Sequence, residues 1–539
     1  MAIEKRKQMK KLSYFLFIIF PLFSLAQAKD EPKANWQNLD LKKDGVFGIS
    51  TERAYSELLN GKTGIPVIVA VIDGGVDVHH EDLRQEIWVN TKEIVGNGID
   101  DDHNGYIDDV NGWDFIGSSR GNVQYDNLEL VRLVCKMQPK YATALNSTKF
   151  SDVERKEFNQ YQKMVAEYMD ELQNAQMGLA QMIVFNKTMD TIVAKIGKPD
   201  LVLLDFENYS PANDIEKKVV KIVRSEFAKN KDFKKIDEEI KEGFKYYDAK
   251  VNYHLNIDFD PRSIVGDDYL NSNERTYGNN DVTGPDAMHG THVSGIIAAS
   301  RSNDIGIGGV SDRARIMAIR VVPDGDERDK DVANGIRYAV DNGAKVINMS
   351  FGKGYSWDKK VVDEAVKYAM SKDVLLVHAA GNDSRNTERK DNYPNKRFAD
   401  SLGVEKGELV VPWIEVGASG WKDDDDLVAG FSNYGKKTVD VFAPGVKIKS
   451  TVPHSLYKEE DGTSMAAPVV AGLAALIRSY YPKLTALQVK DVIMNSVSTV
   501  NHKVKVKVDD SSEKMLLSDI CASGGIVNAY KALKLAAKM

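Results

Sequence analysis

Residues 67–72 constrain the fold more than any other segment of the chain. They form an unbroken apolar run, Val-Ile-Val-Ala-Val-Ile, which ends at Asp73-Gly74-Gly75. A short run of β-branched residues that stops at a turn signal is typical of a strand buried on both faces. Such strands occur where helices cover both faces of a sheet, so the run predicts an α/β fold.

From residue 289 onward, apolar runs and helical patterns alternate. The predicted strands cover 316–322, 346–349, 374–377, 409–416 and 439–442, and the predicted helices cover 331–342, 357–370, 464–480 and 486–497. Regular alternation is typical of parallel strands joined by helical crossovers. It predicts a mostly parallel sheet with helices on both faces.

The stretch 120–275 has a different character. Residues 153–196 contain no proline and carry apolar side chains at helical spacing, while 217–245 are helical in pattern and heavily charged. These patterns predict long helices with solvated faces. We therefore divide the chain into a leader (1–28), an N-terminal arm (29–64), an α/β domain (65–119 and 276–539) and an inserted α-helical subdomain (120–275).

The N-terminus resembles a secretory signal peptide. Lysines and arginines at 5–11 precede an apolar stretch over 12–25 and the small-residue site Ala26-Gln27-Ala28. This pattern predicts cleavage of residues 1–28 and export to the periplasm or the exterior. A retained anchor is the alternative, but the stretch is shorter than the about 20 residues that span a bilayer. No later segment is long and apolar enough to span a membrane.

Composition limits the classes of partner. The formal net charge is -7, which argues against nucleic acid or an anionic membrane as the main partner. Only two cysteines are present, Cys135 and Cys521, so a disulfide framework is excluded. One bridge and two free thiols are both compatible with the sequence. The oligomeric state is not predicted.

Three short segments carry chemistry. Asp73 ends the buried strand, His289 opens a helix in the motif His-Gly-Thr-His, and Ser464 opens another in Gly-Thr-Ser-Met. Polar groups in open α/β sheets gather at the carboxyl ends of the strands. A serine hydroxyl needs a base, an imidazole can take and return the proton, and a carboxylate orients the imidazole. We therefore predict a triad of Asp73, His289 and Ser464.

The order Asp, His, Ser and the residues around each resemble the subtilisin family of serine peptidases (subtilases, peptidase S8). Further matching segments lie at 348–352, 377–383, 431–435, 442–445 and 524–529. The resemblance covers 65–118 and 278–535. It implies a subtilisin-like domain and a secreted serine endopeptidase that hydrolyses polypeptides through an acyl-enzyme on Ser464, with no cofactor for the chemistry.

The resemblance also implies further site residues. Asn382 would donate its side-chain amide to the oxyanion, together with the Ser464 backbone N–H. An extended substrate would pair with one wall of the binding site, and a second wall would line the first specificity pocket. The first wall is Ser350, Phe351 and Gly352, and the second wall is Ala379, Ala380 and Gly381.

Two departures from the family pattern stand out. Gly74 occupies a position that usually holds Ser or Thr, which would remove a hydroxyl near Asp73 and tune activity down. The insertion separates Asp73 from His289; it can be a lid, a substrate-selecting wall or a folding aid, and either dynamic or rigid. The stretch before residue 67 is short for the family's inhibitory prodomain. A non-catalytic scaffold protein and a dedicated processing peptidase are the competing hypotheses.

Residues 100–108 predict a calcium site. The segment places oxygen ligands at positions 1, 3 and 5, glycine at 6 and aspartate at 9, like the first part of an EF-hand loop. Asn111 at position 12 excludes a complete EF-hand, and an Asx-rich surface turn is the alternative. The predicted ligands are Asp100, Asp102, Asn104, Tyr106 and Asp108. The resemblance adds a second candidate site at Asp82 and Asn303.

Overall fold

The computed structural model describes residues 31–399, 405–409, 412–508 and 511–539. The predicted signal peptide therefore lies outside the described residues. The described chain divides into a larger unit, Pro32–Tyr161 with Ile257–Met539, and a smaller unit that contains Gln162–Asn256. Each unit has its own hydrophobic core.

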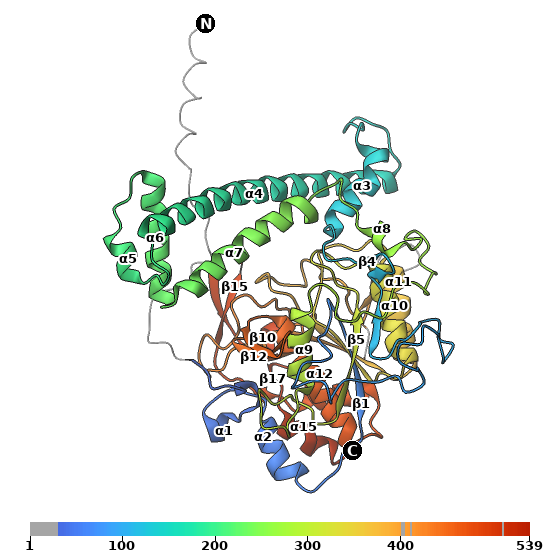
Figure 1. Cartoon of the computed structure of the whole chain (residues 1–539). Helices are drawn as coiled ribbons and strands as arrows, with labels where there is room; N and C mark the ends of the chain where they lie inside the picture. Colours follow the sequence, from blue (N-terminus) through green and yellow to red (C-terminus); the bar gives the residue numbers. More distant parts are fainter. Residues whose placement is uncertain (1–30, 400–404, 410–411, 509–510) are drawn as a thin grey trace. The chain divides into compact units, whose positions relative to one another are not determined.

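A nine-stranded sheet forms the centre of the larger unit (Figure 1). The strand order is β14-β17-β11-β10-β7-β6-β1-β5-β2. All neighbouring strands run parallel except β14 and β17. The prediction of an α/β fold with a mostly parallel sheet is confirmed. The strands are β1 (Val67–Asp73), β2 (Gly112–Asp114), β5 (Ala314–Arg320), β6 (Val346–Met349), β7 (Leu375–Ala379), β10 (Trp413–Ser419), β11 (Val441–Pro444), β14 (Ser498–Thr499) and β17 (Gly525–Ile526).

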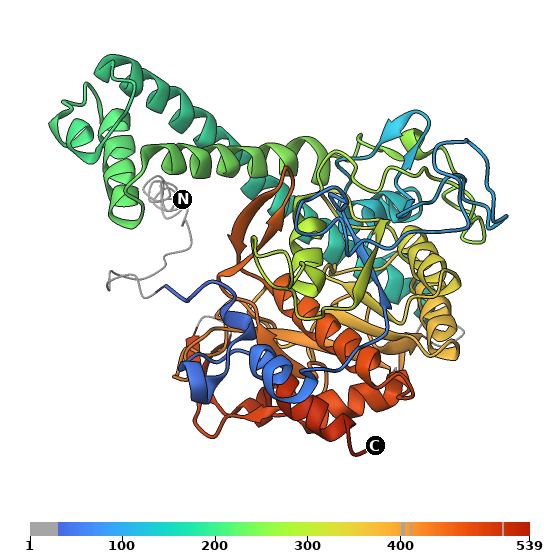
Figure 2. The same ribbon diagram turned by 60° about the horizontal axis from the view of Figure 1, so that its bottom comes forward.

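Strand β1 is buried on both faces, as its composition predicts. Val69 and Val71 belong to one hydrophobic cluster, whereas Ala70 and Ile72 belong to another on the opposite face. The first cluster includes side chains of α9 (Met288–Ala298), α12 (Thr463–Tyr480), α13 (Ala486–Asn495) and α15 (Ala529–Ala536). The second includes those of α10 (Asp329–Asp341) and α11 (Lys359–Ser371), so helices cover both faces (Figures 1 and 2).

The segment predicted as an N-terminal arm is packed into the larger unit. Trp36 is only 1% exposed and belongs to the same cluster as α12. Its indole N–H donates to the Val446 carbonyl at 3.1 Å. The segment contains η1 (Trp36–Asn38), α1 (Leu41–Asp44), α2 (Thr51–Ala54) and η2 (Tyr55–Leu59).

The predicted helical stretch begins and ends in the larger unit. There it contributes α3 (Glu129–Tyr141), α8 (Arg262–Val265) and the start of α4 (Asp152–Ile196). The smaller unit contains the rest of α4 together with α5 (Leu203–Asn208), α6 (Asp214–Lys229), α7 (Phe233–Ala249) and η3 (Lys250–His254). Its core is built from apolar side chains of α4 to α7, including the fully buried Phe206, Val223 and Ile236.

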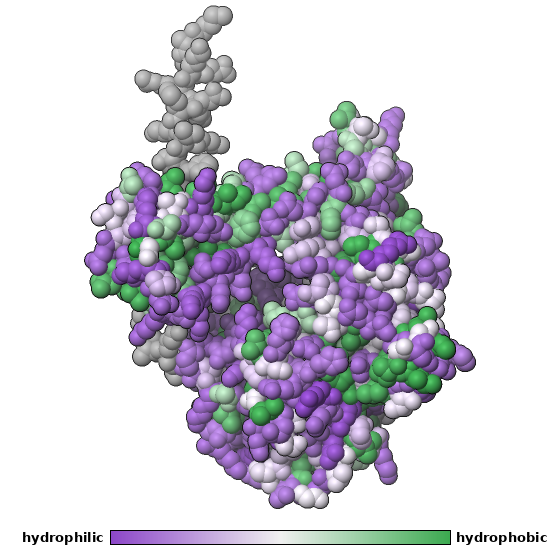
Figure 3. Space-filling view, viewed as in Figure 1, coloured by the Kyte–Doolittle hydropathy of each residue, from purple (hydrophilic) through white to green (hydrophobic). Residues whose placement is uncertain are grey.

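The remaining elements are short. They are β3 (Gly117–Ser118), β4 (Gly121–Asn122), β8 (Arg397–Ala399), β9 (Glu405–Leu409), β12 (Ile448–Val452), β13 (Leu456–Glu460), β15 (Val504–Val508), β16 (Ser511–Met515) and α14 (Leu517–Ile520). Within the described ranges, no helix combines the length and the apolar character needed to cross a membrane. Hydrophilic residues predominate on the face drawn in Figure 3.

Candidate active site

Asp73 is the last residue of β1, which lies between β6 and β5 and is the third strand from one edge of the sheet. Its side chain is buried, and its Oδ1 accepts a hydrogen bond from the Gly74 backbone N–H at 2.7 Å. A Cβ atom at position 74 would lie 3.1 Å from the Val322 carbonyl oxygen, which is a tight contact. A backbone amide therefore supports the carboxylate although residue 74 has no hydroxyl.

His289 lies in the first turn of α9 and contacts Asp73. Its Nδ1 is 2.8 Å from Asp73 Oδ1 and 3.0 Å from Oδ2. A carboxylate can only accept, so Nδ1 donates and Nε2 is left as the proton acceptor. Gly290 permits this approach, because a Cβ there would lie 2.2 Å from the Gly75 carbonyl oxygen and 3.1 Å from Asp73 Cβ.

The two histidines of α9 differ in their electrostatics. Desolvation lowers the pKa of His289, but the charge and the hydrogen bond of Asp73 outweigh it, so the pKa lies above its ordinary value. Among the described residues no carboxylate is hydrogen-bonded to His292, and burial lowers its pKa to about 4. Of the two histidines of this helix, His289 is thus the one whose protonated form is favoured by a carboxylate.

Ser464 is the second residue of α12, where the helix dipole favours negative charge. Its hydroxyl donates to the Ser350 carbonyl at 3.0 Å, and the Ser350 hydroxyl donates to the Ser464 carbonyl at 2.9 Å. Within the described residues, the hydroxyl is bonded to Ser350 rather than to His289. The pair of bonds holds the start of α12 against the segment that follows β6.

Asn382 follows β7, and Thr463 fixes the orientation of its side chain. Asn382 Oδ1 accepts from the Thr463 backbone N–H at 2.9 Å and from the Thr463 hydroxyl at 2.8 Å. The amide oxygen is thereby committed, and Nδ2 remains as the donor. Gly381 has a φ of +98°, a conformation that glycine adopts readily.

Asn433 holds this loop from the other side. Its Nδ2 donates to the Ala380 carbonyl at 2.8 Å, and its Oδ1 accepts from the backbone N–H groups of Asp383 at 3.1 Å and Arg385 at 3.0 Å. The roles of Thr463 and Asn433 were not predicted from the sequence, although both residues lie inside the segments that carry the family resemblance.

The two predicted walls follow neighbouring parallel strands. Ser350-Phe351-Gly352 continues from β6, and Ala379-Ala380-Gly381 lies at the end of β7. Asn392 lies between them: its Nδ2 donates to the carbonyls of Ala379 at 3.2 Å and Ala380 at 3.3 Å. A Cβ on Gly352 would lie 2.5 Å from Asn392 Oδ1. No motif pointed to Asn392.

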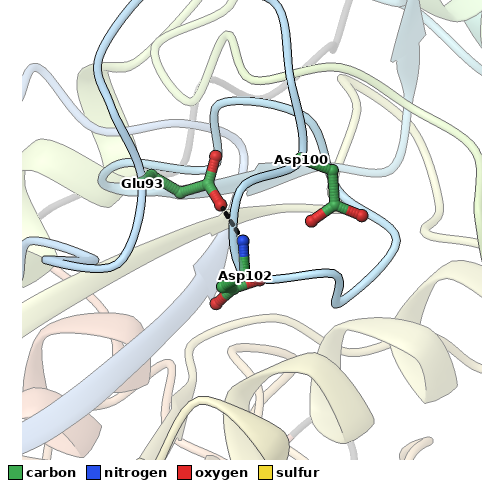
Figure 4. Close-up of side chains that lie close together, drawn as sticks. All are labelled: Glu93, Asp100 and Asp102. Atoms are coloured by element: carbon green, nitrogen blue, oxygen red, sulfur yellow. Dashed lines mark hydrogen bonds between the residues drawn. The ribbon is translucent and has the colours of Figure 1, made fainter.

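Three carboxylates can hold a metal ion away from this site. Glu93, Asp100 and Asp102 each offer an oxygen, and these oxygens lie within 4.8 Å of one another (Figure 4). The Asp102 backbone N–H donates to Glu93 Oε1 at 3.0 Å, which ties the loop together. Asp100 and Asp102 were predicted ligands, whereas Glu93 was missed because it lies outside the repeat of oxygen ligands.

The side chains of the other predicted ligands have different partners. The Asp108 carboxylate accepts from the backbone N–H groups of residues 96, 97 and 98. Asn104 Oδ1 accepts from the Tyr106 backbone N–H at 2.8 Å, and the Tyr106 hydroxyl donates to the carbonyl of residue 275. At the second candidate site, Asn303 Nδ2 donates to Asp82 Oδ1 at 2.7 Å.

Both cysteines are free thiols. Burial raises the pKa of Cys135 and of Cys521, which disfavours the thiolate at either position.

Comparison with known proteins decides the family. A model of the subtilase family (Peptidase_S8) matches residues 64–517. The chain belongs to the subtilase family. It is a serine-type, subtilisin-like peptidase by class, and the family resemblance of its motifs is confirmed.

This subtilase is similar to several bacterial peptidases. It is 39% identical over 234 residues to the thermophilic serine proteinase of Bacillus sp. (strain AK1), covering 43% of this chain and 51% of that protein. It is 36% identical over 247 residues to thermitase of Thermoactinomyces vulgaris, covering 46% of this chain and 75% of thermitase. It is also 38% identical over 239 residues to the cell wall-associated protease of Bacillus subtilis (strain 168), covering 44% of this chain and 24% of that protein.

The aligned part thus spans about half the length of the first relative. A solved structure of proteases from Pseudoalteromonas arctica PAMC 21717 is 28% identical, with a TM-score of 0.38, and covers 48% of this chain and 78% of that chain.

Proposed function

We propose that this subtilase is an exported endopeptidase that hydrolyses polypeptides through an acyl-enzyme on Ser464. The observation that carries the proposal is the 2.8 Å contact between His289 Nδ1 and Asp73 Oδ1, which leaves Nε2 of the ring as a base. The subtilase family match supports the same assignment of Ser464 as the nucleophile.

The reaction begins when the Ser464 hydroxyl turns from the Ser350 carbonyl toward His289. Nε2 of His289 takes the proton as the oxygen attacks the scissile carbonyl, and the buried Asp73 stabilises the imidazolium. The oxyanion accepts from Asn382 Nδ2 and from the Ser464 backbone N–H. His289 then protonates the leaving amine, and water hydrolyses the acyl-enzyme by the same route in reverse.

The substrate is an extended polypeptide. Its backbone adds as an antiparallel strand to Ser350-Phe351-Gly352, and the residue before the scissile bond enters the space lined by Ala379-Ala380-Gly381. Backbone pairing recognises any extended chain, so side-chain preference is set by the pocket.

The metal cluster takes Ca²⁺ as a structural ion. Glu93, Asp100 and Asp102 offer hard carboxylate oxygens, which calcium prefers. The ion would stabilise the loop at 93–108 and take no part in the chemistry.

Export to the periplasm or the exterior follows from the signal-peptide pattern of residues 1–28. The secreted chain would then begin after Ala28, which N-terminal sequencing of protein recovered outside the cytoplasm tests directly.

The activity is tested with a fluorophosphonate probe and with casein as substrate. Labelling and casein hydrolysis are both expected for the wild-type chain and neither for Ser464→Ala. A folded wild-type protein that neither labels nor hydrolyses casein would be a scaffold protein instead. Cleavage profiling on a peptide library then distinguishes a broad peptidase from a processing peptidase with few substrates.

A further inference from the structure

Lys353 immediately follows the wall that the substrate is proposed to pair with. Its backbone N–H donates to the Tyr393 carbonyl at 2.9 Å, and its carbonyl accepts from the Tyr393 N–H at 2.9 Å. Its side chain is 1% exposed. A buried lysine is uncommon and requires full pairing of its charge.

The ammonium group of Lys353 has three acceptors for its three donors. They are Glu129 Oε2 at 2.7 Å, Asp329 Oδ1 at 2.7 Å and the Glu327 carbonyl at 2.6 Å. Burial lowers the pKa of Lys353, but the charges of Asp329 and Glu129 outweigh it and raise the pKa, so the group stays charged.

Glu129 brings the inserted segment into this cluster. It is the first residue of α3, its side chain is fully buried, and it also pairs with Arg132 at 2.7 Å. Its backbone N–H donates to Asp326 Oδ2 at 2.7 Å. The contacts with Arg132 and Asp326 therefore hold Glu129 in place independently of its ion pair with Lys353.

The contacts continue from Lys353 to the second wall. Its backbone partner Tyr393 follows Asn392, whose side chain packs on Gly352 and donates to Ala379 and Ala380. A continuous set of contacts thus runs from α3 to both walls of the proposed substrate-binding site. All of these residues belong to the larger unit.

We propose that Glu129 is a positioning residue for substrate binding, and that it acts through Lys353 to fix the wall Ser350-Phe351-Gly352. This inference rests on the proposed peptidase function. It makes the first helix of the insertion a part of the substrate-binding apparatus. Because the wall pairs with the peptide backbone, the insertion then affects the affinity of the site for an extended peptide.

The test compares a long and a short substrate on Glu129→Gln, which keeps the shape of the side chain and removes its charge. With a tetrapeptide p-nitroanilide, we expect KM to rise about tenfold at nearly constant kcat, as when binding shared by ground and transition states is lost. With a p-nitrophenyl ester of a single acyl residue, kcat/KM should stay within about twofold, since the ester does not use the wall.

Asp267→Asn is the matched control. Asp267 is a fully buried carboxylate near the end of the insertion that pairs with Arg262 and Lys330, and no ion pair joins it to Lys353 among the described residues. Asp267→Asn should lower Tm as Glu129→Gln does, but it should leave the ratio of kcat/KM for the tetrapeptide to kcat/KM for the ester unchanged. An equal change of that ratio in both variants would show a general loss of structure and overturn the proposal.

Lys353→Met keeps the proposal testable if Glu129→Gln does not fold. On its own, Lys353→Met should raise KM for the tetrapeptide and leave kcat/KM for the ester within about twofold, and an unchanged KM would overturn the proposal. Where both single variants fold, the double variant Glu129→Gln/Lys353→Met should show no further rise in KM, because Glu129 acts through Lys353. Additive effects would overturn the proposal. A wild-type chain that hydrolyses neither substrate would instead refute the peptidase function itself, so the two failures are distinguishable.

Discussion

Replacing Asn382 separates its part in catalysis from its part in stability. Asn382→Ala removes the proposed oxyanion donor Nδ2 and also the acceptor Oδ1. In subtilisin, loss of one oxyanion donor lowers kcat about 10²–10³-fold, or about 2.7–4 kcal/mol. Thr463 is 1% exposed, so leaving its N–H and hydroxyl without Oδ1 costs a further about 1–3 kcal/mol of folding free energy.

Asn382→Asp is the matched variant. It retains an oxygen that can accept both bonds from Thr463, so the free energy of unfolding should fall less than in Asn382→Ala. Its catalytic loss should be at least as large, because a carboxylate oxygen replaces the donor and adds negative charge beside the oxyanion.

The assay combines fluorophosphonate titration of active sites, initial rates with a peptide p-nitroanilide, and unfolding in urea. We expect kcat to fall in both variants and stability to fall mainly in Asn382→Ala. A drop in kcat of less than about tenfold in Asn382→Ala, or a loss confined to KM, would refute the assignment of Asn382 as an oxyanion donor.

The remaining predictions concern pH, metal and packing. Catalysis needs neutral His289, whose pKa is raised. The midpoint of the loss of activity on acidification should therefore lie above the ordinary histidine value of about 6.5. His292→Gln should not shift this midpoint, because burial already keeps His292 neutral. Protonated His289 stabilises the fold below its unfolded pKa, and this stabilisation is lost as the pH rises through the folded pKa. The contribution of His289 to the free energy of unfolding should therefore decrease over the pH range in which activity increases. Excess chelator should lower Tm in the wild-type chain but not in the double variant Glu93→Gln/Asp102→Asn, and equal shifts in both would count against this cluster as the site. Trp36→Ala should cost about 3–5 kcal/mol of unfolding free energy, and a cost under about 1 kcal/mol would show that the N-terminal segment is a loose arm.

The parts of the fold that could be predicted depend on local patterns. The apolar run that ends at Asp73 identified β1, because a strand buried on both faces has no polar alternation. The helix that begins next to Ser464 was recognised for a similar reason, since its apolar residues and its Gly-Thr-Ser start are contiguous. Asp73, His289 and Ser464 could be picked out as candidate catalytic residues from such motifs, and their catalytic roles remain a proposal.

Contacts between distant segments could not be predicted in the same way. Lys353 and Glu129 are 224 positions apart, and nothing in the composition around either residue indicates the other. Asp108 fits the spacing of a calcium loop, but the spacing did not indicate that the chain turns there with a φ of +54° or that the carboxylate accepts hydrogen bonds from backbone N–H groups. Thr463 was part of a recognised motif, yet its hydrogen bonds to Asn382 depend on how the segments after β7 and before α12 meet.

The acyl-enzyme itself tests the central claim most directly. The wild-type chain is mixed with a p-nitrophenyl ester that deacylates slowly, quenched in acid, digested and analysed by mass spectrometry. We predict a stoichiometric acyl adduct on Ser464, and none when Ser464→Ala or Asp73→Asn is treated for the same time. Hydrolysis of the ester with no adduct on Ser464, or with an adduct on another residue, would contradict the proposed mechanism.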